Sequence, residues 1–171
     1  MLSIFLSRCF CQFGKNIVED AHPAPAQKAI VQRFIRAILT RCICLASELG
    51  IAEDVHFAGF EPNPYAWMAR AAALVLSSRC EGFANVLVEA LACGANVVST
   101  DCPSGPREIL EGGRWGRLVP VGDAAAMAEA MRGTLRAPLP RKTLQTAAER
   151  FSVERSVSAW QDVLLGRTRN S

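Results

Sequence analysis

The sequence predicts an α/β protein in which helices flank a partial parallel sheet of about four core strands. Short apolar runs, which suit strands buried on both faces, alternate with segments of helical periodicity. The connections between them are short, and such alternation is typical of a parallel, doubly wound sheet. Of the 171 residues 50% are hydrophobic and 20% are charged, which suits one globular domain with a real core.

Strands are expected where short apolar runs are broken by small or polar residues. The run Ala73-Leu-Val-Leu76, for example, stops at Ser77-Ser78. The expected strands are residues 55–58, 73–76, 96–100 and 117–119.

Helices are expected between and after these strands. Apolar residues recur at helical spacing from Val86 to Leu91, and Gly94 is placed to end that helix. Pro64 suits a first helical turn, and Asp123 suits an N-cap. The expected helices are residues 64–71, 84–93, 106–110, 124–135, 141–150 and 153–165.

The chain divides unevenly. Residues 1–45 form a poorly defined segment, helical or irregular, although residues 26–49 have the pattern of one or two amphipathic helices. The regular alternation occupies residues 46–165, which we expect to be the functional domain, and residues 166–171 form a tail.

Composition argues against several functions. The net charge of +3 is small and the basic residues are scattered, so no nucleic-acid partner is expected. No transmembrane segment is expected either. The seven cysteines are an odd number and indicate free thiols in a reducing compartment, hence a cytoplasmic protein. The two Cys-x-Cys pairs, at Cys9 and Cys42, lack the usual zinc spacing, so no metal site is expected.

A candidate site lies in the loop between the strand at 73–76 and the helix at 84–93. The first N–H groups of a helix have no intrahelical partner and, with the helix dipole, favour an anion. Gly82 has no side chain, so the loop backbone can approach a bulky phosphate closely. The segment therefore predicts a site for a phosphorylated ligand at the carboxyl edge of the sheet.

Two carboxylates flank this helix start. Glu81 lies in the loop and Glu89 about two turns along the helix, so the two are not expected to share one proton. Each suits hydroxyl groups at a different end of one elongated ligand, and a sugar nucleotide has that layout. The alternative is structural: Glu81 is then a loop charge and Glu89 a solvated helix residue.

Residues 81–89, Glu-Gly-Phe-Ala-Asn-Val-Leu-Val-Glu, resemble the E-x7-E signature of retaining glycosyltransferases of the GT4 family, which have the GT-B architecture. The similarity extends through the Ser-Gly-Pro-Arg-Glu-Ile loop at 104–109 and covers roughly residues 46–165. It implies one Rossmann-like, donor-binding domain of the two that a GT-B enzyme has. The implied activity is transfer of a sugar, with retention, from a nucleotide diphosphate sugar to an acceptor hydroxyl.

The resemblance also implies roles for individual residues. Glu81 would face the donor sugar as the catalytic residue, and Glu89 would accept hydrogen bonds from the ribose. The turn from Phe60 to Pro62 would lie near the base. Backbone N–H groups for the sugar or the distal phosphate would come from Gly82, Phe83, Ala84 and Asn85. The family needs no metal or other cofactor, because helix N-termini and basic residues stabilise the leaving diphosphate. The donor is expected to be a uridine diphosphate (UDP) sugar used in polysaccharide biosynthesis.

The sequence also departs from the family pattern. The family's first strand of this domain leads into a glycine-rich loop with an Arg and a Lys for the diphosphate, and no such segment precedes Val55. The acceptor-side residues would lie on a missing N-terminal GT-B domain. The chain is therefore expected to be incomplete, with a non-catalytic nucleotide-sugar-binding module or an inactive fragment as the alternatives. Peripheral association with the inner face of a membrane stays open.

Overall fold

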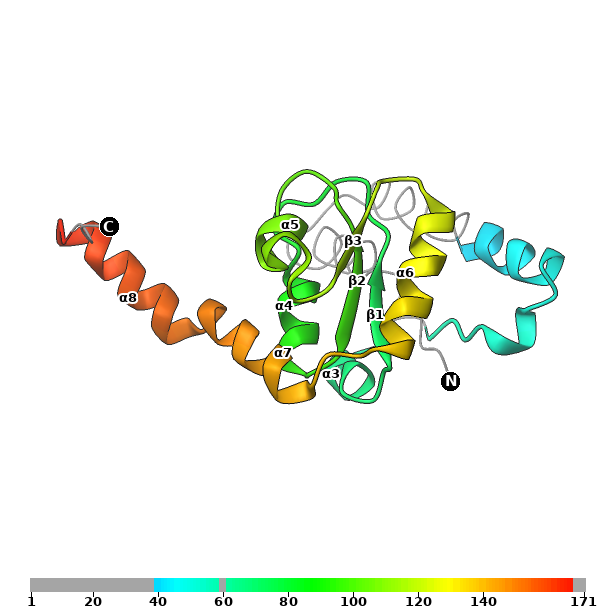
Figure 1. Cartoon of the computed structure of the whole chain (residues 1–171), viewed down its shortest axis with the longest axis horizontal. Coiled ribbons are helices and arrows are strands. Elements are labelled where there is room, and N and C mark those ends of the chain that lie inside the picture. The colour runs from blue at the N-terminus through cyan, green and yellow to red at the C-terminus, as the bar shows by residue number, and fades with distance from the viewer. Residues whose placement is uncertain (1–38, 59–60, 168–171) are drawn as a thin grey trace, which may run out of the picture.

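Three parallel strands form the sheet in the computed structural model, which describes residues 39–58 and 61–167 (Figure 1). They are β1 (Ala73–Leu76), β2 (Asn96–Thr100) and β3 (Arg117–Val119), in the order β1-β2-β3. In the register Val75 pairs with Val98, and Ser99 pairs with Leu118. The expected α/β class, the parallel pairing and these three strand positions are confirmed.

The strand expected at residues 55–58 is wrong. A short 3-10 helix, η1 (Ala52–Asp54), precedes it, and Val55 has an extended backbone with φ −109° and ψ 117°. Residues 55–58 nevertheless pair with no strand in the described part of the chain. An apolar run predicts an extended backbone, but a strand also needs a neighbour for its N–H and C=O groups. The described sheet therefore has three strands rather than about four.

One face of the sheet is covered by α4 (Asn85–Ala92) and α7 (Arg141–Ala148), with α3 (Pro64–Met68) and α5 (Pro106–Ile109) beside α4. Leu76, Leu87 and Leu144 have no exposed surface in the core of this layer. Burying one such side chain contributes about 1.5–3 kcal/mol, so this layer fixes α4 firmly against β1 and β2.

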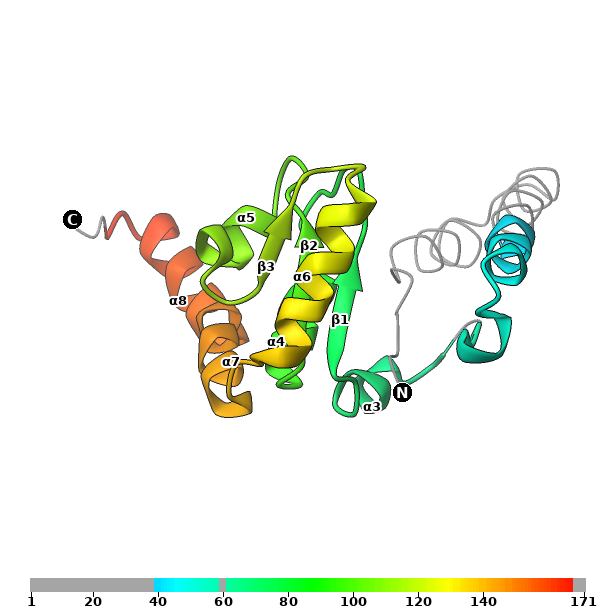
Figure 2. The same cartoon turned by 45° about the vertical axis from the view of Figure 1, so that its right-hand side comes forward.

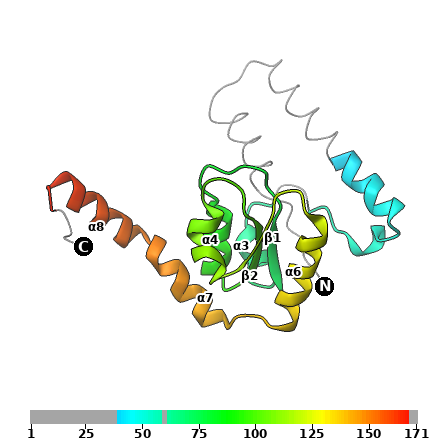
Figure 3. The same cartoon turned by 45° about the horizontal axis from the view of Figure 1, so that its top comes forward.

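The other face is covered by α6 (Ala124–Arg136), on the opposite side of the sheet from α4 (Figures 2 and 3). Val75, Val98 and Val119, one from each strand, pack there against Ala130. The Asp123 carboxylate accepts a hydrogen bond of 2.8 Å from the Ala126 N–H, so the expected N-cap is confirmed. The sheet is thus buried on both faces, as its continuous apolar strands require.

The end of α4 has the geometry expected from its glycine. Gly94 has φ +72°, a conformation in which a Cβ would be strained. Its N–H donates to the Leu91 carbonyl oxygen at 2.8 Å, and the Ala95 N–H donates to that of Ala90 at 2.9 Å. These two bonds form a Schellman motif, which ends the helix and returns the chain towards β2.

The C-terminal part extends away from the sheet (Figure 1). The helix expected at 141–150 ends earlier: α7 stops at Ala148, and a 3-10 turn, η3 (Glu149–Phe151), follows. Ser152 then caps α8 (Val153–Leu164) by accepting a hydrogen bond from the Arg155 N–H. No residue of α8 is buried.

The N-terminal side is described only in part. Residues 39–48 are helical and end at a turn with Gly50, and the rest of the expected helical region falls outside the described residues. Among the described helices none combines the length and the apolar character needed to cross a membrane.

Candidate functional site

Hydrogen bonds tie the carboxyl ends of β1 and β2 together. Thr100, the last residue of β2, donates its hydroxyl proton to the Ser78 carbonyl oxygen at 2.5 Å. The Ser78 hydroxyl in turn donates to the Glu81 carboxylate. The loop after β1 is therefore fixed from the neighbouring strand, at the edge of the sheet where the sequence predicts the site.

Glu81 is held inside this loop. Its side chain is 7% exposed, which is unusual for a carboxylate and requires hydrogen-bond partners such as Ser78. Cys102, in the loop after β2, lies close enough to respond to it: burial raises the pKa of the Cys102 thiol, and the Glu81 charge raises it further. Glu81 is therefore a buried, hydrogen-bonded carboxylate rather than an exposed loop charge.

Glu89 occupies a different position. It is half-buried on α4, about 6 Å along the helix axis from the first helical residue, Asn85, which is about one turn rather than the expected two. Its Oε1 accepts a hydrogen bond of 3.4 Å from the Tyr65 hydroxyl on α3. The two carboxylates thus engage different hydroxyl groups, as expected if each serves a different part of a long ligand.

The loop between the carboxylates is mostly open. Gly82 is exposed, and no atom lies within 4 Å of the position that a Cβ would take there. Phe83 is 44% exposed, Ala84 is buried and Asn85 is exposed. The Asn85 N–H already donates to the Phe83 carbonyl oxygen at 2.7 Å, so the other three nitrogens are better candidates for a ligand.

The loop after β2 lies directly against this segment. Gly105 has φ +97°, and a Cβ built on it would lie 3.0 Å from the Ala84 nitrogen and 3.5 Å from the Phe83 Cα. Asp101, in the same loop, forms an ion pair with Arg107 of α5. The hydrogen bond from Arg107 to Asp101 raises the pKa of the Arg107 guanidinium. The two loops therefore form one packed surface.

Of Phe60 and Pro62, which are expected near the base, the structure describes only Pro62. Pro62 is exposed and immediately precedes Asn63, the N-cap of α3. Phe60 lies outside the described residues.

Three supporting residues were missed by sequence reasoning. Ser78 and Thr100 follow or end buried strands, and a hydroxyl at the carboxyl end of a parallel strand is a signal that could have found them. Tyr65 gives no such signal, because the contact between α3 and α4 is a tertiary one.

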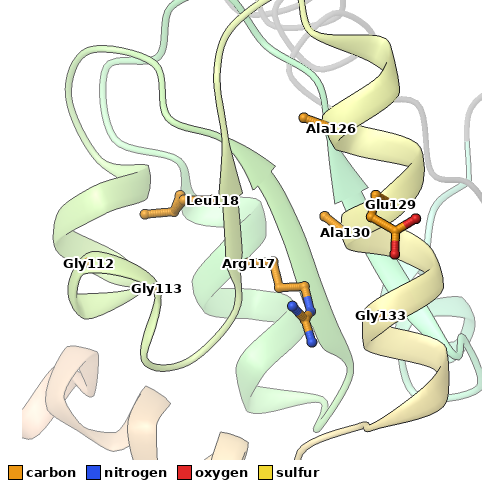
Figure 4. Close-up of a pocket in the computed structure, with 8 residues that line it drawn as sticks. All are labelled: Gly112, Gly113, Arg117, Leu118, Ala126, Glu129, Ala130 and Gly133. Carbon is orange, nitrogen blue, oxygen red and sulfur yellow. The ribbon is translucent and has the colours of Figure 1, made fainter.

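A cavity of about 490 Å³ lies elsewhere, between β3 and α6 (Figure 4). Arg117 and Glu129 are its charged residues, and its other lining residues are small or apolar. None of the site residues expected from the sequence lines it.

The chain is similar to known proteins in sequence and in fold. The profile of the family described as "Glycosyl transferases group 1" matches residues 35–137. A curated relative from Campylobacter jejuni, N-acetylgalactosamine-N,N'-diacetylbacillosaminyl-diphospho-undecaprenol 4-alpha-N-acetylgalactosaminyltransferase, is 37% identical over 107 residues. That match covers 63% of this chain and 29% of the relative.

Solved structures show the same fold. The apo form of the lipopolysaccharide outer core galactosyltransferase WaaB matches with a TM-score of 0.67 and 24% identity, over 75% of this chain and 38% of that one. Anabaena HepE in complex with UDP matches with a TM-score of 0.62 and 22% identity, over 80% of this chain and 38% of that one. The chain therefore spans between 29% and 38% of the length of these proteins.

Proposed function

The chain belongs to the family of glycosyl transferases group 1, and we propose that it binds a nucleotide diphosphate sugar as the donor half of a retaining sugar-transfer enzyme. The observation that carries the proposal is the pair of separately held carboxylates. Buried Glu81 and half-buried Glu89 flank the start of α4 at the carboxyl edge of a parallel sheet. Open α/β sheets bind ligands at that edge.

The ligand is assigned along α4. The diphosphate lies at the helix N-terminus, where unpaired N–H groups and the helix dipole favour negative charge. Glu89 accepts hydrogen bonds from the ribose hydroxyls, and Glu81 accepts them from the donor sugar. The base lies towards Pro62. We propose UDP as the nucleotide of the donor, because the structure of HepE, which shares the fold, is a complex with UDP.

In the transfer step this chain holds and polarises the donor. Negative charge develops on the leaving diphosphate, and preorganised N–H groups at the start of α4 stabilise it without a metal ion. Glu81 fixes the sugar so that its anomeric carbon faces the acceptor. The acceptor hydroxyl comes from a partner domain, since this chain matches only 29% to 38% of the length of the relatives compared. We place the reaction in the cytoplasm, at the inner face of a membrane.

Calorimetric titration with UDP and with UDP-sugars tests the role of each carboxylate. Wild-type protein should bind UDP with high-micromolar affinity. Glu89→Gln should weaken UDP binding by roughly 10- to 150-fold, the range for a hydrogen bond to a charged group. Glu81→Gln should leave UDP binding unchanged and weaken only the binding of a UDP-sugar.

Glu129→Gln is the matched control, because Glu129 lines the cavity beside α6 and not the site. The assignment fails if Glu81→Gln weakens UDP binding more than Glu89→Gln does, or if wild-type protein does not bind UDP. A mass-spectrometric transfer assay tests the partner domain: the chain alone should form no glycoside, and a fusion with an upstream GT-B domain and the missing donor strands should. Robust transfer by the chain alone would contradict the need for a partner.

A further inference from the structure

A ring contact links the proposed donor loop to the C-terminal part of the chain. The Phe83 and Phe151 rings meet edge to face, with their centroids 5.8 Å apart and their planes at 68°. Phe83 belongs to the loop between β1 and α4, whereas Phe151 ends η3. We propose that Phe151 is a positioning residue that orders loop 82–85 through Phe83, an inference that rests on the proposed function of that loop.

Phe151 is itself firmly supported. The guanidinium of Arg150 lies over its ring, 4.7 Å from the centroid. The same guanidinium donates hydrogen bonds to the Ile109 carbonyl oxygen and the Glu111 carboxylate, which attach η3 to the end of α5 and the turn after it. Phe151 therefore has a fixed place relative to the end of α5 and the turn after it.

The donor loop is anchored at one end by Ala84, which is buried in the core, and two further contacts bear on Phe83. Gly105 lies against the backbone of Phe83 and Ala84, and Phe151 meets the Phe83 ring. Phe83 is 44% exposed, so burial alone does not hold its side chain. The Phe151 ring supplies a directional contact for this side chain instead, and through Phe83 it restrains the loop backbone.

The alternative role for Phe151 is packing alone, as the anchor of α8. The two roles differ in what a change of ring chemistry does. Phe151→Leu keeps an apolar side chain but removes the ring, whereas Phe151→Tyr keeps the ring. An aromatic pair contributes beyond its buried area by an amount equal to roughly 2- to 12-fold in an equilibrium constant.

Backbone ¹⁵N relaxation of the free protein tests the ordering directly. In wild-type protein and in Phe151→Tyr the amides of 82–85 should have order parameters near the rigid value of about 0.85, and in Phe151→Leu those of Gly82 and Phe83 should fall towards the flexible value of about 0.6. The β2 amides should not change in any variant. Trp160→Leu, at a 67% exposed aromatic residue of α8, is the matched control and should leave the loop unchanged.

Ligand binding tests the functional consequence, with UDP and uridine monophosphate as probes. The loop is assigned to the distal phosphate, which only UDP has, so Phe151→Leu should lower UDP affinity by about 2- to 12-fold and leave the monophosphate unaffected. Phe151→Tyr, which keeps the ring, should bind UDP and the monophosphate as wild-type protein does.

The outcomes separate the two proposals. Unchanged order parameters in Phe151→Leu overturn the positioning role, whatever the binding data show. If Phe151→Leu loses loop order but wild-type protein binds no UDP, the positioning role of Phe151 stands and the proposed function is refuted. A preference for UDP that survives in Phe151→Leu would overturn the link between Phe151 and the ligand.

Discussion

Gly105→Ala should destabilise the protein by forcing apart two loops at the candidate site. Gly105 has φ +97° and ψ −66°, which an alanine adopts at a cost of about 1–3 kcal/mol. The new Cβ would lie 3.0 Å from the Ala84 nitrogen, so the loop must also shift by a few tenths of an ångström. Such overpacking costs about 1–3 kcal/mol.

A smaller effect works in the opposite direction. Alanine restricts the unfolded chain and so favours folding by about 0.4–1 kcal/mol. The net loss in the free energy of unfolding should be about 1–5.5 kcal/mol, a large part of the 5–15 kcal/mol typical of a domain. Urea unfolding followed by circular dichroism should show the midpoint falling by roughly 0.5–3 M.

Gly82→Ala is the matched control for this change. It lies in the facing loop, and its Cβ would meet no atom within 4 Å. Its stability should stay within about 0.5 kcal/mol of wild type. Under the proposed function UDP binding should weaken, because the methyl group would lie where the phosphate is proposed to approach. A Gly105→Ala midpoint equal to that of wild type would refute the argument, as would equal losses in the two variants.

Four further predictions concern the fold. Leu87→Ala, at a side chain with no exposed surface, should cost about 2–5 kcal/mol in urea unfolding, and a loss below about 1 kcal/mol would contradict the packing described. Asp123→Ala removes the N-cap of α6 and should cost about 0.5–2 kcal/mol by the same measurement, with no change contradicting the cap. In the native protein a thiol reagent should modify exposed Cys80 much faster than Cys102, which is 3% exposed and whose pKa burial raises; equal rates would argue against that burial. Because the unfolded thiol ionises first, the Cys102 contribution to stability is present at low pH and lost as the pH rises above the ordinary thiol pKa. Cys102→Ala should reduce this slope without abolishing it, because burial also raises the pKa of Cys93.

The elements best predicted from the sequence are those that local chemistry determines. Asp123 and Gly94 mark a helix start and a helix end by hydrogen bonds to their own neighbours, and both were placed correctly. The strands at 73–76, 96–100 and 117–119 are apolar runs between such signals, and their bounds match.

What the sequence could not supply is contact between distant segments. Residues 55–58 have the composition of a strand, but no described strand lies beside them. Tyr65 reaches Glu89, and Phe151 reaches Phe83, across folds of the chain that no local pattern encodes. The roles of Glu81 and Glu89, like the division at residue 46, stay predictions.

The strand order has a consequence for how the sheet forms. Since β1, β2 and β3 lie side by side in the order of the chain, each strand pairs with the next one along, about 20 residues later, and contact order within the sheet stays low for a parallel arrangement. A nascent chain can therefore add each strand as it emerges, without waiting for a distant segment. The Ser78–Thr100 hydrogen bond can then close as soon as β2 has docked on β1, before β3 and the C-terminal helices are made.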